Sequence, residues 1–176
     1  MFKKFYPFEY VESVFAIDYN KLYNLGYKAI IFDVDNTLVH HGDDSNENVD
    51  NLFREIHNTG LKTLLLSNND IDRIKRFIKN IDTLYICDAD KPSTVNYLKA
   101  IEMLEVKKDE AIYIGDQVFI DIVGANKAGI DNILVKFIGY YTETKIGIKR
   151  HLEKIILWFY KNSKYQNRLR HITKEE

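Results

Sequence analysis

Two acidic residues separated by one position follow a short apolar segment, in residues 32–38 (FDVDNTL). Neighbouring carboxylates repel each other unless a counter-charge is present. Mg²⁺ can supply that charge, because it prefers oxygen ligands and binds one or two carboxylates together with phosphate and water. A carboxylate such as Asp33 can also attack phosphorus, while a second one, Asp35, protonates the leaving alkoxide and later deprotonates water. The alternative is an acidic turn that caps a strand.

Three further positions could hold a phosphate. Ser67 and Asn68 follow a second apolar segment and precede a helix, where a hydroxyl and backbone N–H groups suit phosphate oxygens. Lys91, followed by the rigid Pro92, offers a cation that would offset charge on the phosphoryl group and on Asp33. The ordinary alternatives are a helix cap for Ser67 and a surface position for Lys91.

A last group consists of Gly115 and Asp116 at the end of another apolar segment, with Asp121 five positions further on. The glycine permits a tight turn, so Asp116 can point to the same cation as Asp33. Asp121 could support that site directly, or through water or Lys91. A Gly-Asp pair alone is common in loops, but the four groups together form a specific pattern.

Short apolar segments alternate with helical patterns along the chain. The segments predicted to be buried strands are residues 28–33, 62–67, 83–86, 111–114 and 132–135. Between them we expect helices that begin at Ser45 and Ser93, one containing Ile71 to Ile78, and one that ends at Gly129. This alternation predicts an α/β fold, with a three-layer, Rossmann-like, mostly parallel sheet and helices on both faces. Ligands bind beyond the carboxyl ends of such strands, so the four groups should meet on one rim.

The four groups resemble the motifs of the haloacid dehalogenase (HAD) superfamily of phosphatases, across residues 28–135. The resemblance implies Asp33 as nucleophile and Asp35 as acid/base. It also implies Mg²⁺ bound by the carboxylates of Asp33 and Asp116 and by the backbone carbonyl of Asp35. An acid two positions after the nucleophile suits phosphate esters and disfavours dehalogenation. The other assigned residues are Ser67, Asn68 and Lys91 for phosphate binding, and Thr37, Gly115 and Asp121 for support.

Two other stretches are similar to the YqeG-type branch of that superfamily, subfamily IIIA. They are Pro7, Tyr10-Val11, Ser13-Val14 and Ile17-Asp18 before the first strand, and residues 115–121 (GDQVFID) with 124–129 (GANKAG). Members of this branch, and a related yeast mitochondrial enzyme, are phosphatidylglycerophosphate phosphatases of glycerophospholipid synthesis, so the resemblance implies a lipid substrate. The alternatives are a phosphatase acting on a protein, a nucleic-acid end or a small phosphometabolite, and a non-catalytic phosphate-binding scaffold.

The 176 residues fit a single domain, with a catalytic core at 28–135, an N-terminal arm at 1–27 and a basic, aromatic C-terminal helix or tail at 136–176. The gaps after the first and second strands are too short for a large cap domain. We therefore expect an open active site, which suits a large or surface-bound phosphomonoester. His40 and His41, in the loop after the nucleophile, could touch the substrate or be solvated.

The net charge of −1 hides an uneven distribution, because residues 145–171 hold eight basic residues and one acid. A basic, aromatic segment suits an anionic membrane surface, and nucleic acid is the less favoured partner. The alternative is a helix that packs Leu152, Ile155, Ile156 and Phe159 on the body. With one cysteine, no signal-peptide core and no membrane-length apolar run, we expect a cytoplasmic protein, with a peripheral position on the inner membrane face as an option.

Overall fold

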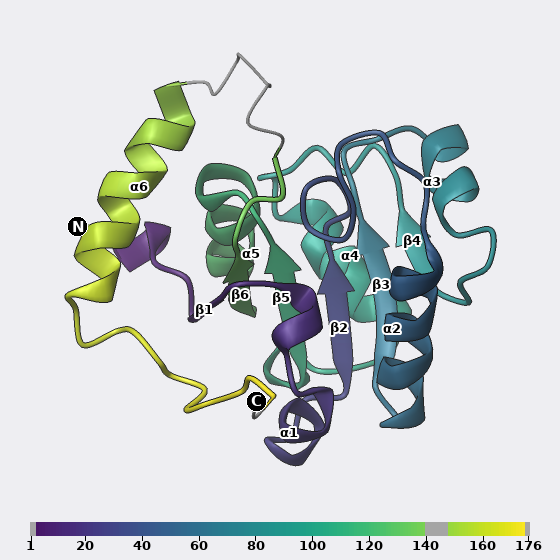
Figure 1. The fold of residues 1–176 in the computed structure, drawn as a ribbon, viewed down its shortest axis with the longest axis horizontal. Helices are drawn as coiled ribbons and strands as arrows, with labels where there is room; N and C mark the ends of the chain where they lie inside the picture. Colours follow the sequence, from purple (N-terminus) through teal and green to yellow (C-terminus); the bar gives the residue numbers. More distant parts are fainter. Residues whose placement is uncertain (1–2, 140–147, 175–176) are drawn as a thin grey trace.

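The computed structural model describes residues 3–139 and 148–174. In this part of the chain a six-stranded sheet has the order β1-β6-β5-β2-β3-β4, and each strand is parallel to its neighbours. The strands are β1 (Glu9–Val11), β2 (Ala29–Phe32), β3 (Lys62–Leu66), β4 (Leu84–Ile86), β5 (Ala111–Gly115) and β6 (Asp131–Val135) (Figure 1). The predicted α/β fold with a parallel sheet is confirmed.

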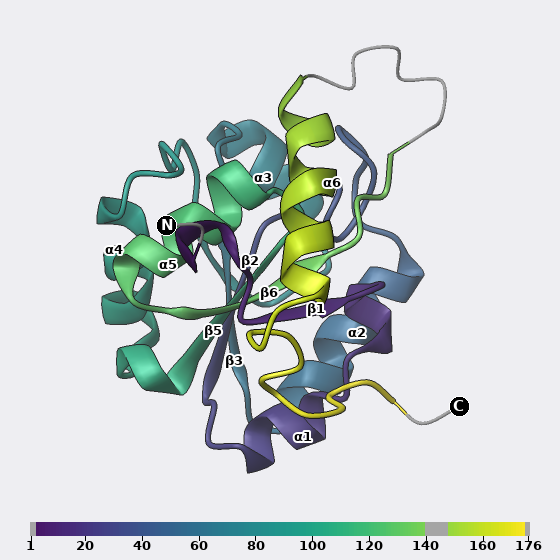
Figure 2. The ribbon, with the colours of Figure 1, turned by 90° about the vertical axis from the view of Figure 1, so that its left-hand side faces the viewer.

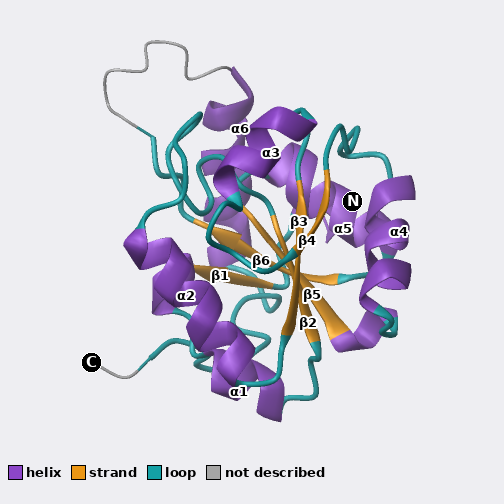
Figure 3. Cartoon of the chain, turned by 90° about the vertical axis from the view of Figure 1, so that its right-hand side faces the viewer, coloured by secondary structure: helices purple, strands orange, loops and turns teal. Residues whose placement is uncertain are grey.

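Helices cover both faces of this sheet (Figure 3). They are α1 (Tyr19–Asn24), α2 (Glu47–Asn58), α3 (Ile71–Phe77), α4 (Val95–Leu104), α5 (Val123–Ala128) and α6 (Ile148–Lys161). Successive side chains of a strand point to opposite faces. In β2, Ile30 and Phe32 join an apolar core with residues of α1, α2 and α3, whereas Ala29 and Ile31 join a second core with residues of α4 and α5. The structure therefore has three layers, as predicted.

The two connections that could have carried a cap domain hold single helices. The chain between β2 and β3 contains α2, and the chain between β3 and β4 contains α3. Both connections are described in full, and neither holds a large cap domain. The prediction of an uncapped site is therefore confirmed.

Two elements that the sequence did not reveal precede β2. β1 lies at the edge of the sheet beside β6, with Glu9 opposite Ile133. The buried Glu9 carboxylate accepts a hydrogen bond from the N–H of Leu169 at 3.0 Å. α1 begins after Asp18, whose side chain accepts from the N–H of Lys21. The first 27 residues thus contribute a strand and a helix to the body.

Two predicted helix starts are wrong by one residue. Asn46, rather than Ser45, caps α2, because its side chain accepts a hydrogen bond from the first turn. The Ser45 hydroxyl instead donates to Asp50 at 2.8 Å. α4 follows Thr94 rather than Ser93, with no side-chain cap. Where short polar residues are adjacent, backbone geometry decides which one caps the helix.

α6 packs beside the β1–β6 edge of the sheet (Figure 2). Its Ile156 contacts a small core that includes residues of the π-helical turn Val118–Ile122. Leu152, Ile155 and Phe159 remain 46%, 54% and 49% exposed. The alternative of a helix packed on the body thus holds for Ile156, whereas the other three side chains stay largely exposed. Of the helices described, none has the length and apolar character needed to cross a membrane.

Candidate active site

The predicted site residues lie at the carboxyl ends of neighbouring strands. Asp33 follows β2, Ser67 follows β3 and Asp116 follows β5, and these strands are adjacent in the sheet (Figure 1). The N–H of Asp33 donates to the carbonyl of Ile114 at 2.9 Å, so the β2–β5 ladder continues to Asp33. Parallel strands therefore bring these side chains to one rim, as predicted.

Lys91 is the centre of a buried polar network. Its Nζ donates to Asp33 Oδ1 at 2.7 Å, to Asp121 Oδ1 at 2.8 Å and to the Tyr113 hydroxyl at 3.0 Å. Tyr113 in turn donates to Asp121 Oδ1 at 2.7 Å. The side chains of the lysine and both acids are at most 8% exposed. Because desolvated charges must be paired and hydrogen-bonded, the network fixes the orientation of all three.

The electrostatics of this network are dominated by burial. Burial raises the pKa of Asp33 to about 6, although the ammonium of Lys91 opposes that shift. Burial alone would lower the pKa of Lys91, but Asp121 and Asp33 raise it above its usual value. Burial also raises the pKa of Asp116 well above its usual value, against the opposing charge of Arg150. Lys91 is therefore charged, and the crowded carboxyls would be stabilised as carboxylates by a cation.

Three carboxylates converge in a manner that fits a divalent cation. One oxygen from each of Asp33, Asp116 and Asp121 lies within 4.8 Å of the others. The Thr37 hydroxyl donates to Asp33 Oδ2 at 3.1 Å and lies 3.5 Å from Asp116 Oδ1, so these two acids face a common space. Both oxygens of Asp121 accept hydrogen bonds from other groups. Asp33 and Asp116 thus fit as oxygen ligands, and Asp121 fits as the support of Lys91.

The carboxylate of Asp35 has a different set of partners. Its Oδ1 accepts from Arg73 Nη2 at 2.9 Å and from the N–H of Gly42 at 3.2 Å. Its Oδ2 accepts from Asn69 Nδ2 at 2.8 Å and lies 3.1 Å from His41 Nδ1. Burial would raise the pKa of Asp35, but the hydrogen bonds from Asn69 and Gly42 and the charge of Arg73 lower it overall. Asp35 is thus an ionised carboxylate beside, rather than within, the three-carboxylate cluster.

The side chains of Ser67 and Asn68 have different partners: Ser67 contacts Asn69, and Asn68 contacts the backbone of Lys91. The Ser67 hydroxyl accepts from the backbone N–H of Asn69 at 3.2 Å and from its side chain at 2.9 Å. Asn68 Oδ1 accepts from the backbone N–H of Lys91 at 2.8 Å. A hydroxyl that accepts hydrogen bonds can still donate its own proton. These contacts are therefore compatible with the predicted phosphate binding.

Two glycines permit the close packing behind the site. A Cβ on Gly115 would lie 2.6 Å from Cγ of Asp121, and one on Gly124 would lie 2.4 Å from the Tyr97 hydroxyl. That hydroxyl donates to a carbonyl of the π-helical turn Val118–Ile122, which carries Asp121. A side chain at Gly115 would therefore displace Asp121, and one at Gly124 would displace Tyr97, which contacts the turn that carries Asp121.

Several residues contact the predicted ones but were not themselves predicted. Tyr113 resembles a core residue in the sequence. The one signal that it has a polar role is its hydroxyl group, which stands within an otherwise aliphatic strand. Arg73 stands in the first turn of α3 beside a capping residue, Asp70, but nothing local indicates its partner. In the sequence Arg150 is one of the basic residues of the tail, yet its guanidinium donates to the Asp116 carboxylate and, at 2.9 Å, to its carbonyl. The contacts of Arg73 and Arg150 span more than 30 residues of sequence.

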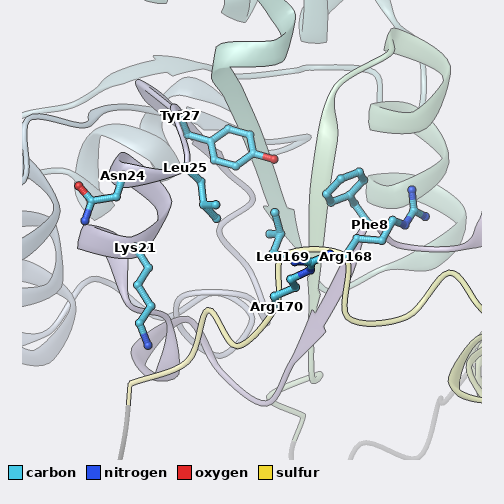
Figure 4. A pocket seen from close by; sticks show the side chains of 8 residues that line it. All are labelled: Phe8, Lys21, Asn24, Leu25, Tyr27, Arg168, Leu169 and Arg170. Atoms are coloured by element: carbon cyan, nitrogen blue, oxygen red, sulfur yellow. The ribbon is translucent and has the colours of Figure 1, made fainter.

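A pocket of about 600 Å³ lies at the other end of the sheet (Figure 4). There Tyr27, just before β2, donates to Asp131 at the start of β6, at 2.8 Å. This pocket is therefore separate from the rim that carries Asp33. Its lining residues, drawn from α1 and the C-terminal segment among others, are Phe8, Lys21, Asn24, Leu25, Tyr27, Arg168, Leu169 and Arg170.

The parallel sheet carries an acid pair after the central strand β2, a buried lysine, and a third acid after the neighbouring strand β5, which is the arrangement that the sequence predicts for a phosphatase. The chain belongs to the haloacid dehalogenase-like hydrolases, whose family model matches residues 41–129. It is 36% identical over 137 residues to the Bacillus subtilis (strain 168) protein named "Probable phosphatase YqeG", covering 77% of this chain and 80% of that protein. The predicted YqeG-type phosphatase of the HAD superfamily is thus confirmed.

Solved structures share this fold. An uncharacterized protein from Listeria monocytogenes serotype 4b matches with a TM-score of 0.55 and 18% identity, covering 76% of this chain and 99% of that one. The cobalt-bound deoxy-D-mannose-octulosonate 8-phosphate phosphatase from Haemophilus influenzae matches with a TM-score of 0.50 and 18% identity, covering 80% and 92%. At this level of identity, both comparisons bear on the fold alone.

Proposed function

We propose that the chain is a Mg²⁺-dependent phosphomonoester hydrolase that forms an aspartyl-phosphate on Asp33. The observation that supports this most strongly is the position of Asp33, held by Lys91 and facing the same space as Asp116. The carboxylates of Asp33 and Asp116, with the backbone carbonyl of Asp35, would hold Mg²⁺, which offsets negative charge on the phosphoryl group.

The remaining chemistry falls to the side chains. A carboxylate oxygen of Asp33 attacks phosphorus while the bond to the leaving alkoxide breaks and that alkoxide takes a proton from Asp35. Water then attacks phosphorus and gives a proton to Asp35 as the bond to Asp33 breaks, which releases phosphate. A phosphate beside Asp35 raises the pKa of that residue, which supplies the proton for the first step. Lys91, with Ser67 and Asn68, holds the phosphoryl oxygens.

Hydrolysis of an aryl phosphate at saturating Mg²⁺ tests this mechanism. Asp33→Asn preserves the shape of the side chain but removes the attacking carboxylate, so the rate should fall to the background level. The matched control is Asp109→Asn, which alters an exposed acid far from the rim and should keep the wild-type rate. If the Asp33→Asn protein hydrolyses the ester at the wild-type rate, Asp33 is not the nucleophile.

We further propose a lipid phosphate, phosphatidylglycerophosphate, as the substrate, taken at the inner membrane face. The open rim admits a large headgroup, and α6 presents the composition of an interfacial helix. Its exposed lysines, Lys149, Lys154 and Lys161, suit anionic lipid. Its exposed apolar side chains recur at helical spacing: Leu152, Ile155, Trp158 and Phe159.

Two measurements test the lipid proposal. Rates on phosphatidylglycerophosphate in vesicles should exceed those on a 3′-phosphorylated oligonucleotide and on sugar phosphates, and equal slow rates on all three would contradict it. Ile155→Asp should reduce co-sedimentation with phosphatidylglycerol vesicles, because it places a charge in the apolar face. Val95→Asp, at a residue of α4 that is 68% exposed, is the matched control and should bind like the wild type.

A further inference from the structure

Arg150 ties α6 to the active-site rim. Its Nη2 donates to Asp116 Oδ2 in a short contact, and its Nη1 donates to the Asp116 carbonyl at 2.9 Å. The Asp116 side chain is fully buried, and that of Arg150 is 20% exposed. A guanidinium that binds a carboxylate in this way is both charged and geometrically specific. An element far along the chain thus places a fixed cation on a residue of the carboxylate cluster.

The same guanidinium has other partners that do not involve Asp116. Arg150 Nη1 donates to Glu153 Oε2 at 2.9 Å, and the guanidinium lies over the ring of Phe137 at 4.4 Å. Glu153 is itself anchored, because its Oε1 accepts from the N–H of Val118 at 2.9 Å. If Arg150 leaves Asp116, it keeps its ion pair with Glu153 and its contact with the Phe137 ring. The guanidinium is therefore not left without a partner when it is displaced.

We propose that Arg150 and the divalent cation compete for Asp116, so that cation binding loosens the tie between α6 and the rim. A guanidinium and a divalent cation on one buried carboxylate share a single negative charge and repel each other. Each therefore weakens the binding of the other, and the coupling is reciprocal. This inference rests on the metal site of the proposed function.

Calorimetric titration with Mg²⁺ alone measures the competition without reference to activity. Arg150→Met removes the guanidinium, so Mg²⁺ should bind about tenfold more tightly than to the wild type. Arg150→Lys keeps the charge but loses the planar fork, so its affinity should lie between the two. Lys154→Met removes an equal charge from an exposed position of the same helix and should bind as the wild type does.

Asp116→Asn separates this inference from the metal site itself. If Asp116→Asn leaves Mg²⁺ binding intact, the proposed metal site is wrong. If it abolishes binding, the metal site stands, and the Arg150 variants alone decide whether Arg150 competes with Mg²⁺. The inference is overturned if Arg150→Met binds Mg²⁺ no more tightly than the wild type, or gains no more than Lys154→Met. Amide hydrogen exchange measures the opposite direction of the coupling, the effect of Mg²⁺ on α6. Mg²⁺ should speed exchange in α6 of the wild type but not in α6 of Arg150→Met. Unchanged exchange in the wild type would also overturn the inference.

Discussion

Replacement of Lys91 by methionine tests whether the buried network sustains the fold as well as the site. Methionine has a similar length but no charge, so Asp33 and Asp121 would each lose a donor at 2.7–2.8 Å while remaining buried. Removing one partner of a buried ion pair destabilises a protein by about 3–5 kcal/mol. Because the Tyr113 hydroxyl still donates to Asp121, we expect the lower part of that range.

The pH dependence of this loss has a definite sign. The penalty arises from ionised carboxylates without a counter-charge, and protonation removes it. Burial already raises the pKa of Asp33 to about 6 with Lys91 in place, and removal of the lysine, which lowers that pKa, can only raise it further. The difference in unfolding free energy between wild type and Lys91→Met should therefore be larger at pH 8 than at lower pH, shrink as the pH falls toward 6, and level off below the wild-type pKa of Asp33.

Urea unfolding at pH 8 and pH 5.5 measures both effects. Lys28→Met is the matched control, because Lys28 pairs with Glu110 on the surface and its loss should change stability little. Adding Asp121→Asn to Lys91→Met should recover part of the loss by removing one unpaired charge. A loss at pH 8 of less than about 1 kcal/mol, or a deficit that grows as the pH falls, would refute this account of the network.

Three further predictions concern other parts of the site. Gly115→Ala should destabilise the protein by about 1–3 kcal/mol in thermal unfolding, because its Cβ would meet Asp121 at 2.6 Å; an unchanged melting temperature would contradict this. Arg73→Lys should raise the pKa of Asp35 by weakening a contact that holds it ionised; because Asp35 must carry the proton that the leaving alkoxide takes, the basic limb of the kcat–pH profile should move to higher pH, and an unmoved limb would argue against the role of this contact. Mg²⁺ should raise the melting temperature more at pH 7.5 than at pH 5, because Asp33 must lose its proton to bind the cation; an equal shift at both values would count against Asp33 as a ligand.

Much of the fold was predictable because it depends on local patterns. Short aliphatic runs such as residues 29–32 and 111–115 are typical of buried parallel strands, and helical periodicity separates them. β1 has no such run: it is three residues long, and one of them is the buried Glu9. Its place in the sheet depends on β6 and on Leu169, which only folding brings together.

The sequence by itself determined which side chains meet at the rim. Asp33, Lys91 and Asp116 each follow a strand, and the carboxyl ends of parallel strands meet at one edge, so their convergence follows from topology alone. Only the tertiary structure decided how those groups are charged and held. Tyr113 and Arg150 reach the site through packing between elements distant in the chain, and burial of the carboxyls, rather than their identity, raises the pKa of Asp33 and of Asp116.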